Sequence, residues 1–321
     1  MNKIIISGII SSLLITNITA AEYKEAVSTF QKAVDTYDSV FAKGTKLATT
    51  LDENNNIHPD IFLPINFTQS LSTAIEYRTT QELQNGTVDG DYDSSNKDTT
   101  LDKEILNLYL LKYSIKNQKS TYSFGIGYSS ESFNKNQKGF VTSGATTLTF
   151  DNNINIDIQG VSIFADAIYY NIIDDLSAKI NILILAASKL DVTQDTELVG
   201  FSNGQGSSSE DLDLIYELRA DFNYDLTSYM DLGFETRYKF LPMKYSLEMA
   251  QSDSTFTTEK YEVDEKITYN ALKLYFKIDL LGSLRPMVGY SIEKTDGTNK
   301  LDSTSYSNTE NMFMFGLNTK F

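Results

Sequence analysis

The chain has 321 residues and a formal net charge of −16 at pH 7, with 27 Lys and Arg against 43 Asp and Glu. This acidic balance argues against nucleic-acid binding, because nucleic-acid-binding proteins present basic patches to the phosphates. Cysteine is absent, which excludes a small secreted scaffold held together by disulfides.

The chain contains a single histidine, His58. Acid–base catalysis near neutral pH most often uses histidine, and nucleophilic catalysis usually pairs a histidine with Ser or Cys. We therefore expect no enzyme activity, no cofactor and no metal site. His58 itself is interpreted as a residue of a connecting segment.

The first 21 residues predict a secretory signal peptide. A short charged start is followed by an apolar run over 4–15 and by small residues up to Ala21, where cleavage is expected. An uncleaved anchor is the alternative, but the apolar run is short for a spanning helix. No later segment reaches about 18 uninterrupted apolar residues, so no transmembrane helix is predicted.

An amphipathic helix is predicted over residues 22–44, because apolar residues recur at steps of three and four. It is interpreted as a helix that packs its apolar stripe on a neighbouring element, as a plug, or as a coiled-coil segment. Residues 45–65 contain Pro59 and Pro64 and an acidic, Asn-rich run, and they predict an irregular connector.

From residue 66 onward, apolar residues alternate with a period of two, which is the pattern of strands. The alternating runs are long enough to cross a bilayer at a tilt, which takes about 9–11 residues. Parity changes near Gly160, which predicts a β-bulge. The expected strands lie at 66–79, 104–116, 120–132, 154–170, 176–189, 211–225, 229–241, 266–281, 284–295 and 309–321.

The last expected strand, Thr309–Phe321, has one apolar face and ends the given sequence on an aromatic residue. Its face carries Phe313, Phe315, Leu317 and Phe321. This ending resembles the final strand of bacterial outer-membrane β-barrel proteins. The resemblance implies that these four residues form a signal for the barrel-assembly machinery. It also implies an all-β fold, namely a transmembrane antiparallel up-and-down barrel over 66–321. The N-terminal amphipathic helix expected over 22–44 would precede the barrel, as a periplasmic helix or as a plug inside it.

The expected strands number about ten, and twelve are possible if residues 140–150 also pair within the membrane. Connections alternate strictly between short and long, and outer-membrane barrels have short periplasmic turns and long external loops. We therefore expect both termini in the periplasm and the long loops outside the cell. A soluble β-sandwich is disfavoured, because its outward faces would be polar. The short connections are 117–119, 171–175, 225–228 and 281–283, and the long ones are 80–103, 133–153, 190–210, 242–265 and 296–308.

Charged residues of both signs lie opposite the apolar rows, and they are expected to face the lumen because charges facing lipid are costly. They are interpreted either as ion pairs that hold a narrow lumen nearly closed or as a constriction that selects solutes. A tight turn at 225–228 places Glu217 opposite Arg237 and Arg219 opposite Glu235. The expected lumen residues are Glu217, Arg219, Glu235, Arg237, Lys239, Lys273, Lys277 and Arg285, and Glu76 and Arg78 lie on the same face of their strand.

The sequence thus predicts a bacterial outer-membrane barrel that acts as a narrow porin or small-solute channel. The alternative is a non-conducting structural or adhesive surface protein that uses acidic external loops. The expected partners are outer-membrane lipid, the assembly machinery and small solutes, and no nucleic acid.

Overall fold

The structure is a computed structural model in which part of the chain is described. The described residues are 45–52, 57–84, 98–143, 146–173, 175–198, 202–251, 259–278, 284–301, 303 and 305–319. The signal peptide over 1–21, the helix over 22–44 and Phe321 lie outside them, so those predictions stay predictions. No helix among the described residues is long and apolar enough to cross a membrane.

The described chain is built from antiparallel strands that close into a ring. Twelve strands form the wall, because β10 pairs with both β9 and β11, and β13 pairs with β1. The strand β8 lies between β7 and β10 at one end of the ring. The strands are β1 (Lys46–Leu51), β2 (Ile57–Asn66), β3 (Leu71–Gln84), β4 (Asp98–Lys116), β5 (Ser120–Ser143), β6 (Thr146–Ile173), β7 (Leu176–Leu198), β8 (Ser202–Asp211), β9 (Ile215–Thr227), β10 (Met230–Gln251), β11 (Glu259–Ile278), β12 (Leu284–Asn299) and β13 (Ser305–Thr319).

The expected connector over 45–65 is wrong, because β1 and β2 occupy most of it and close the ring. The two prolines of β2 hid this strand from the sequence pattern. Pro59 faces Thr49 of β1, at a point where pairing with β3 has not begun, and Pro64 faces Ala74 of β3, beyond the last pair with β1. Each proline therefore lies where β2 has one neighbour, and a missing N–H is tolerated there.

Twelve strands therefore arise for a different reason from the one expected. Residues 140–143 and 146–149 pair with each other and simply extend β5 and β6. The bulge predicted at Gly160 is confirmed, since the β6–β7 register shifts between Gln159 and Val161. A second register shift, between Leu108 and Leu111, explains why alternation failed in β4.

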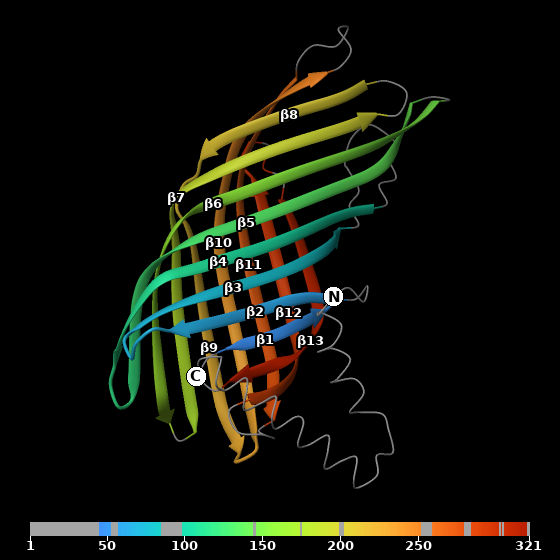
Figure 1. Cartoon of the computed structure of the whole chain (residues 1–321). Coiled ribbons are helices and arrows are strands. Elements are labelled where there is room, and N and C mark those ends of the chain that lie inside the picture. Colours follow the sequence, from blue (N-terminus) through green and yellow to red (C-terminus); the bar gives the residue numbers. More distant parts are fainter. Residues whose placement is uncertain are drawn as a thin grey trace, which may run out of the picture.

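Several of the expected long loops are wrong, because strands continue through them. The strands β5 and β6 cover most of 133–153, β7 and β8 cover most of 190–210, and β10 and β11 enter 242–265. As Figure 1 shows, β5 to β8 rise well above β1, β2 and β13, so the barrel has one tall side. We call the upper part of the wall, as oriented in Figure 1, the upper zone. It consists of residues 132–143, 146–159, 188–198, 202–211, 241–251 and 259–267. The rest of the described wall is the lower zone.

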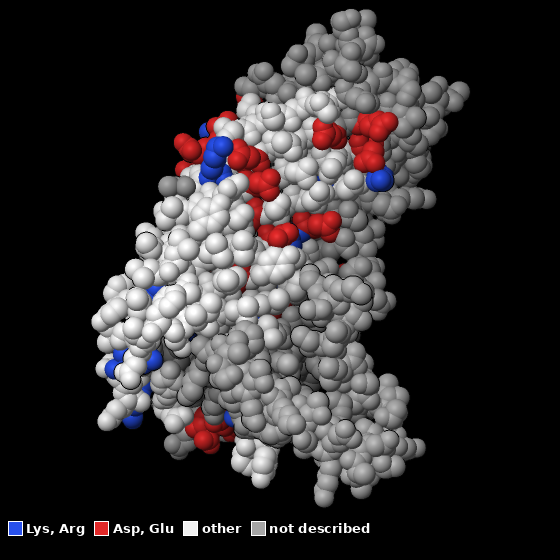
Figure 2. Space-filling model, viewed as in Figure 1, with Lys and Arg blue, Asp and Glu red and all other residues white. Residues whose placement is uncertain are grey.

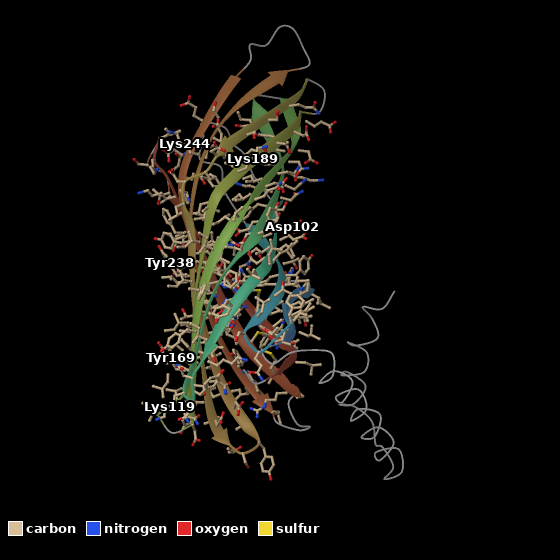
Figure 3. The ribbon with its side chains drawn as sticks, turned by 60° about the vertical axis from the view of Figure 1, so that its left-hand side comes forward. Asp102, Lys119, Tyr169, Lys189, Tyr238 and Lys244 are labelled. Atoms are coloured by element: carbon tan, nitrogen blue, oxygen red, sulfur yellow. The ribbon has the colours of Figure 1, made fainter. Side chains whose placement is uncertain are left out.

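In the lower zone the outward-facing side chains are apolar and exposed. Figure 3 places Tyr169 near the bottom of the barrel and Tyr238 well above it, with Lys189 and Lys244 higher still. Figure 2 shows largely uncharged atoms over the middle of one face and acidic groups gathered toward the top. The apolar outward residues include Ile75, Leu110, Leu111, Phe124, Ile126, Val161, Ile163, Ile180, Ile182, Leu218, Leu272, Leu274, Phe276, Val288 and Ile292.

In the upper zone this polarity is inverted. The outward positions of β5 to β8 carry mainly Ser, Thr, Asn, Gln and Asp, and outward side chains hydrogen-bond across strands, as between Asn134 Nδ2 and Asn155 Oδ1 at 2.7 Å. The inward positions of the upper zone and the strand segments beside it form a buried apolar cluster. We call it the apolar core, and it consists of Ile158, Leu185, Leu190, Val192, Ile215, Leu241, Met243 and Leu247.

Candidate functional site

The interior of the lower zone carries the residues that the sequence singled out. All eight lie on the inward-facing positions of β9 to β12, and Lys273 and Lys277 are only 1% exposed. Side chains alternate across a strand, so the exposed apolar neighbours face outward and these charges face inward. The residues are Glu217, Arg219, Glu235, Arg237, Lys239, Lys273, Lys277 and Arg285.

Glu76 on β3 accepts hydrogen bonds from four side chains. It accepts hydrogen bonds from Asn107 Nδ2 and Tyr109 Oη, each at 3.0 Å. Across the barrel it accepts a short hydrogen bond from Arg219 Nη2 and another from Arg237 Nη2 at 3.3 Å. Because β3 and the strands β9 and β10 lie far apart around the ring, Glu76 ties opposite walls together.

A second set of ion pairs joins β1 and β2 to β10 and β11. Asp60 Oδ2 lies 2.7 Å from Lys46 Nζ and 3.0 Å from Lys273 Nζ. Glu235 lies 3.6 Å from Lys46 Nζ and 3.8 Å from Lys273 Nζ. Sequence reasoning missed Lys46 and Asp60, because both fell in the expected connector. The available signal was that each charge directly precedes an apolar residue on the opposite face of the strand, with Leu47 after Lys46 and Ile61 after Asp60.

The expected register between β9 and β10 is wrong by two residues. Glu217 faces Lys239, and Arg237 faces Arg219. Glu217 still reaches Arg237 diagonally, with 3.1 Å between Glu217 Oε1 and Arg237 Nε. Diagonal neighbours on one face of a sheet are within reach of long side chains, so the contact survives the shift.

Further ion pairs lie above and below this layer. Lys239 pairs with Glu131 of β5 near the upper zone, and Arg285 pairs with Asp231 toward the opposite end. Lys277 Nζ donates to Asn223 Oδ1 at 3.0 Å. The interior charges therefore form a stack of contacts along the barrel rather than a single ring.

These contacts fill the interior instead of lining an open passage. Glu76, Arg237 and Lys239 are each 3% exposed, a measure that includes exposure to any internal space large enough for water. A carboxylate or guanidinium facing a wide aqueous lumen would be far more exposed. The arrangement can hold the two walls together and can exclude solutes at this level.

His58 lies in β2, so its expected place in a connector is wrong. It is 6% exposed, and its Nε2 lies 3.1 Å from Asp52 Oδ2. Asp52 directly follows β1, so this contact links the two arms of the β1–β2 hairpin.

The residues of the implied assembly signal lie at the end of β13. Phe313 and Phe315 are exposed on the outward face at 57% and 47%, and Leu317 is partly buried. Their burial pattern is that of apolar outward rows elsewhere in the lower zone.

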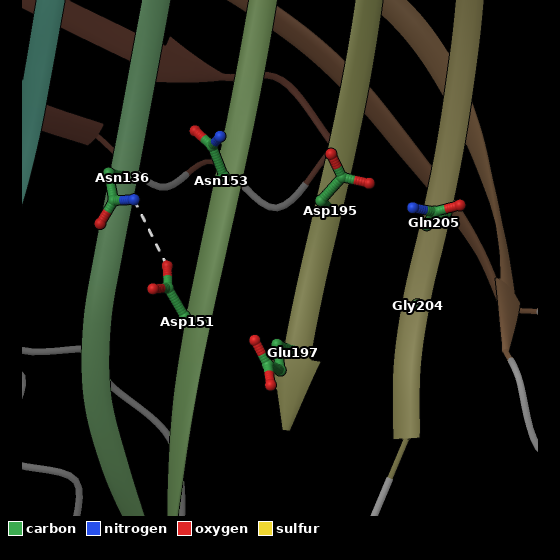
Figure 4. A pocket seen from close by; sticks show the side chains of 7 residues that line it. All are labelled: Asn136, Asp151, Asn153, Asp195, Glu197, Gly204 and Gln205. Carbon is green, nitrogen blue, oxygen red and sulfur yellow. Dashed lines mark hydrogen bonds between the residues drawn. The ribbon is translucent and has the colours of Figure 1, made fainter. Parts of the chain in front are cut away.

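A shallow pocket of about 290 Å³ opens on the outward face of the upper zone, across β5 to β8 (Figure 4). Within it, Asn136 Nδ2 donates to Asp151 Oδ1 at 3.3 Å. Its lining is polar, with carboxylates and amides and no aromatic side chain. The lining residues are Asn136, Asp151, Asn153, Asp195, Glu197, Gly204 and Gln205.

No protein-family model and no curated protein matches this sequence. Among solved structures, the outer membrane protease OmpT from Escherichia coli is similar over 87% of this chain and 93% of its own, at 10% identity and a TM-score of 0.45. The CymD monoaromatic hydrocarbon channel is similar over 95% of this chain and 94% of its own, at 9% identity and a TM-score of 0.45. The Pseudomonas putida toluene transporter TodX is similar over 87% of this chain and 88% of its own, at 8% identity and a TM-score of 0.46. TM-scores this low carry no weight for fold or function, which rest on the strand pairing and the interior contacts.

Proposed function

We propose that the chain is a bacterial outer-membrane β-barrel that works at the cell surface and whose membrane section is closed to free diffusion. The apolar outward rows of the lower zone, with Tyr169 below and Tyr238 above, support the membrane location. Outer-membrane barrels present such an apolar band between aromatic girdles. A polar outer face supports placing the upper zone outside the bilayer.

One observation carries the closed state, namely the contacts of Glu76 with Arg219 and Arg237 across the interior. An open porin keeps its charged constriction hydrated, whereas these three side chains occupy the space between opposite walls. This supports the surface-protein reading over the narrow porin.

A narrow small-solute channel is the second candidate. A ring of twelve strands is wider than the eight-strand barrels whose interiors side chains just fill. The ring is closed by ion pairs, and a rearrangement of those ion pairs could open it. In that case the charged stack acts as a gate.

The orientation and the assembly signal are part of the same proposal. With the end of β13 in the periplasm, the tall side of the barrel projects from the cell. Deleting Phe321 should lower the amount of barrel in the outer membrane if the terminal aromatic is read during assembly. Unchanged levels would argue against that signal.

Conductance in planar bilayers tests the closed state. The wild-type barrel should be silent, whereas Glu76→Ala, which removes the cross-barrel tie, should give discrete conductance steps. Heat modifiability on gels checks that both proteins are folded. Discrete steps from the folded wild-type protein would overturn the closed state and support the channel.

A further inference from the structure

Arg78 on β3 is a buried cation whose hydrogen-bonding capacity is not used up. It is 3% exposed, and its Nε and Nη1 have no hydrogen-bond partner among the described residues. Its Cζ lies 5.6 Å from the centroid of the Tyr269 ring. A buried guanidinium that lacks acceptors on two nitrogens has donors left for an anion, with which it forms charge-assisted hydrogen bonds.

A second cation converges on the same ring. Lys103 Nζ lies 4.3 Å from the centroid of Tyr269 and 5.3 Å from that of Phe133. Tyr269 Oη in turn donates to Glu293 Oε2, which holds the ring in place. Arg78 and Lys103 therefore bring two positive charges to one aromatic side chain, where the lower zone meets the upper zone.

The inward surface directly above these cations is mainly apolar, with Lys135 and Glu265 two positions beyond Phe133 and Ile267 on the same strands. Phe133 faces Ile156 across β5 and β6, and Ile267 lies two positions from Tyr269 on the same face of β11. These side chains are only partly buried and pack against the apolar core. The partly buried set is Phe133, Ile154, Ile156, Leu212, Tyr245 and Ile267.

We propose that the upper interior binds a single-chain amphipathic anion, with its alkyl chain on this apolar lining and its anionic head at Arg78 and Lys103. The inference goes beyond the proposed function, because it holds for a silent barrel as well as for a channel. The apolar lining selects an alkyl chain, and the free donors of Arg78 select a carboxylate or sulfate over a neutral head. A polar solute would gain nothing from the apolar lining. A neutral head would offer Nε and Nη1 of Arg78 an acceptor without a charge, and so a weaker hydrogen bond than a carboxylate or sulfate.

The absence of tryptophan from the chain allows a direct test. Phe133→Trp places a single emitter on the lining, and Phe124→Trp places one on the lipid-facing wall, where Phe124 is 55% exposed. Each folded variant in phosphatidylcholine vesicles is titrated with dodecanoate brominated at its terminal carbon, and then with the matching brominated dodecanol. Ile267→Trp repeats the test if Phe133→Trp fails to fold.

The emitter at position 133 should show saturable quenching by the acid, with at least about tenfold weaker binding of the alcohol. Position 124 should show only the non-saturable quenching that reports probe dissolved in the bilayer. Combining Arg78→Gln with Phe133→Trp should weaken binding of the acid by about tenfold. Lys138→Gln, which removes an exposed cation paired with Asp151 on the outer face, should leave binding unchanged.

Three results would overturn the proposal. They are equal affinities for the acid and the alcohol, unchanged affinity in Arg78→Gln, and quenching at position 133 or 267 that rises without saturation as it does at position 124.

Discussion

The lower and upper zones are built from the same strands but have opposite polarity. On β5, the outward residue Phe124 is exposed and apolar, and ten positions further along the same face stands Asn134. The inward face changes in the reverse direction, from Glu235 and Arg237 on β10 to Leu241 and beyond. Strand geometry is constant, so the proposed membrane location explains the inversion, with lipid outside the lower zone and water outside the upper zone.

The two zones also fill their interiors by different means. The lower zone uses ion pairs that cross the barrel, and the upper zone uses the apolar core. Charges on the outside of the lower zone would face lipid, at a cost of about 2–4 kcal/mol near the midplane for Arg or Lys. Placed inside, they must be paired, which explains why the same wall carries so many cross-barrel contacts.

The largest loss of stability is expected from replacing Glu76, which contacts opposite walls of the lower zone. Glu76→Ala removes the carboxylate of β3 that Arg219 and Arg237 share across the barrel, and among the described residues only carboxylates of β9 and β10 remain beside them. Removing one partner of a buried ion pair costs about 3–5 kcal/mol. Urea unfolding in vesicles measures this loss. A loss below about 1 kcal/mol would show that the cross-barrel contacts are not structural.

The next effect tests the upper zone. Leu247→Ala opens a cavity in the apolar core, where Leu247 is 1% exposed, and should cost about 2–4 kcal/mol. Leu218→Ala is the matched control, because Leu218 faces outward at 42% exposure and leaves no cavity. Equal losses in the two variants would argue against a packed core in the upper zone.

A smaller effect concerns one contact within the lower zone. Glu217→Ala and Arg237→Ala should each destabilise the barrel, and the double variant should cost less than the sum by about 0.5–3 kcal/mol. Urea unfolding in vesicles of the two single variants and the double variant measures this coupling energy. Strict additivity would mean that the 3.1 Å diagonal contact does not contribute.

The smallest effect lies on the exposed face of the upper zone. Hydrogen bonding from Ser209, and then the charge and hydrogen bond of Lys189, lower the pKa of Asp191. A carboxyl whose folded pKa is depressed stabilises the fold above its unfolded value of about 3.9 and loses that contribution as pH falls further. Asp191→Asn should therefore weaken protection of the β7–β8 hairpin in hydrogen exchange at pH 7 and make no difference near pH 2. A difference that persists at pH 2 would contradict this assignment.

The antiparallel barrel and the inward face of β9 to β12 were predictable from the sequence because a strand with one apolar face and one charged face keeps a strict period of two. Apolar residues were expected on the outward face of each strand along its whole length. Segments such as 190–198, with polar residues outside and Leu190 and Val192 inside, were therefore interpreted as loops. Alternation with polar residues outside and apolar residues inside also indicates a strand. This signal was present in the sequence, but it was interpreted as a loop.

The remaining misses have local causes. Pro59 and Pro64 concealed β2, and only the pairing of its two neighbours shows that each proline is tolerated. The contacts of Glu76 with β9 and β10 depend on which strands face each other across the ring. The alternation along its strand placed Glu76 on the inward face, but it could not identify the partner of Glu76.

We infer that β5 leaves the membrane between Phe124 in the lower zone and Asn134 in the upper zone. Phe124→Trp and Asn134→Trp each place a single tryptophan on the outward face of β5 in a chain that otherwise has none. In vesicles of brominated lipid, the emitter at 124 should be strongly quenched and the emitter at 134 should not. Equal quenching at both positions would place the upper zone in the bilayer and contradict the division of the barrel into two zones.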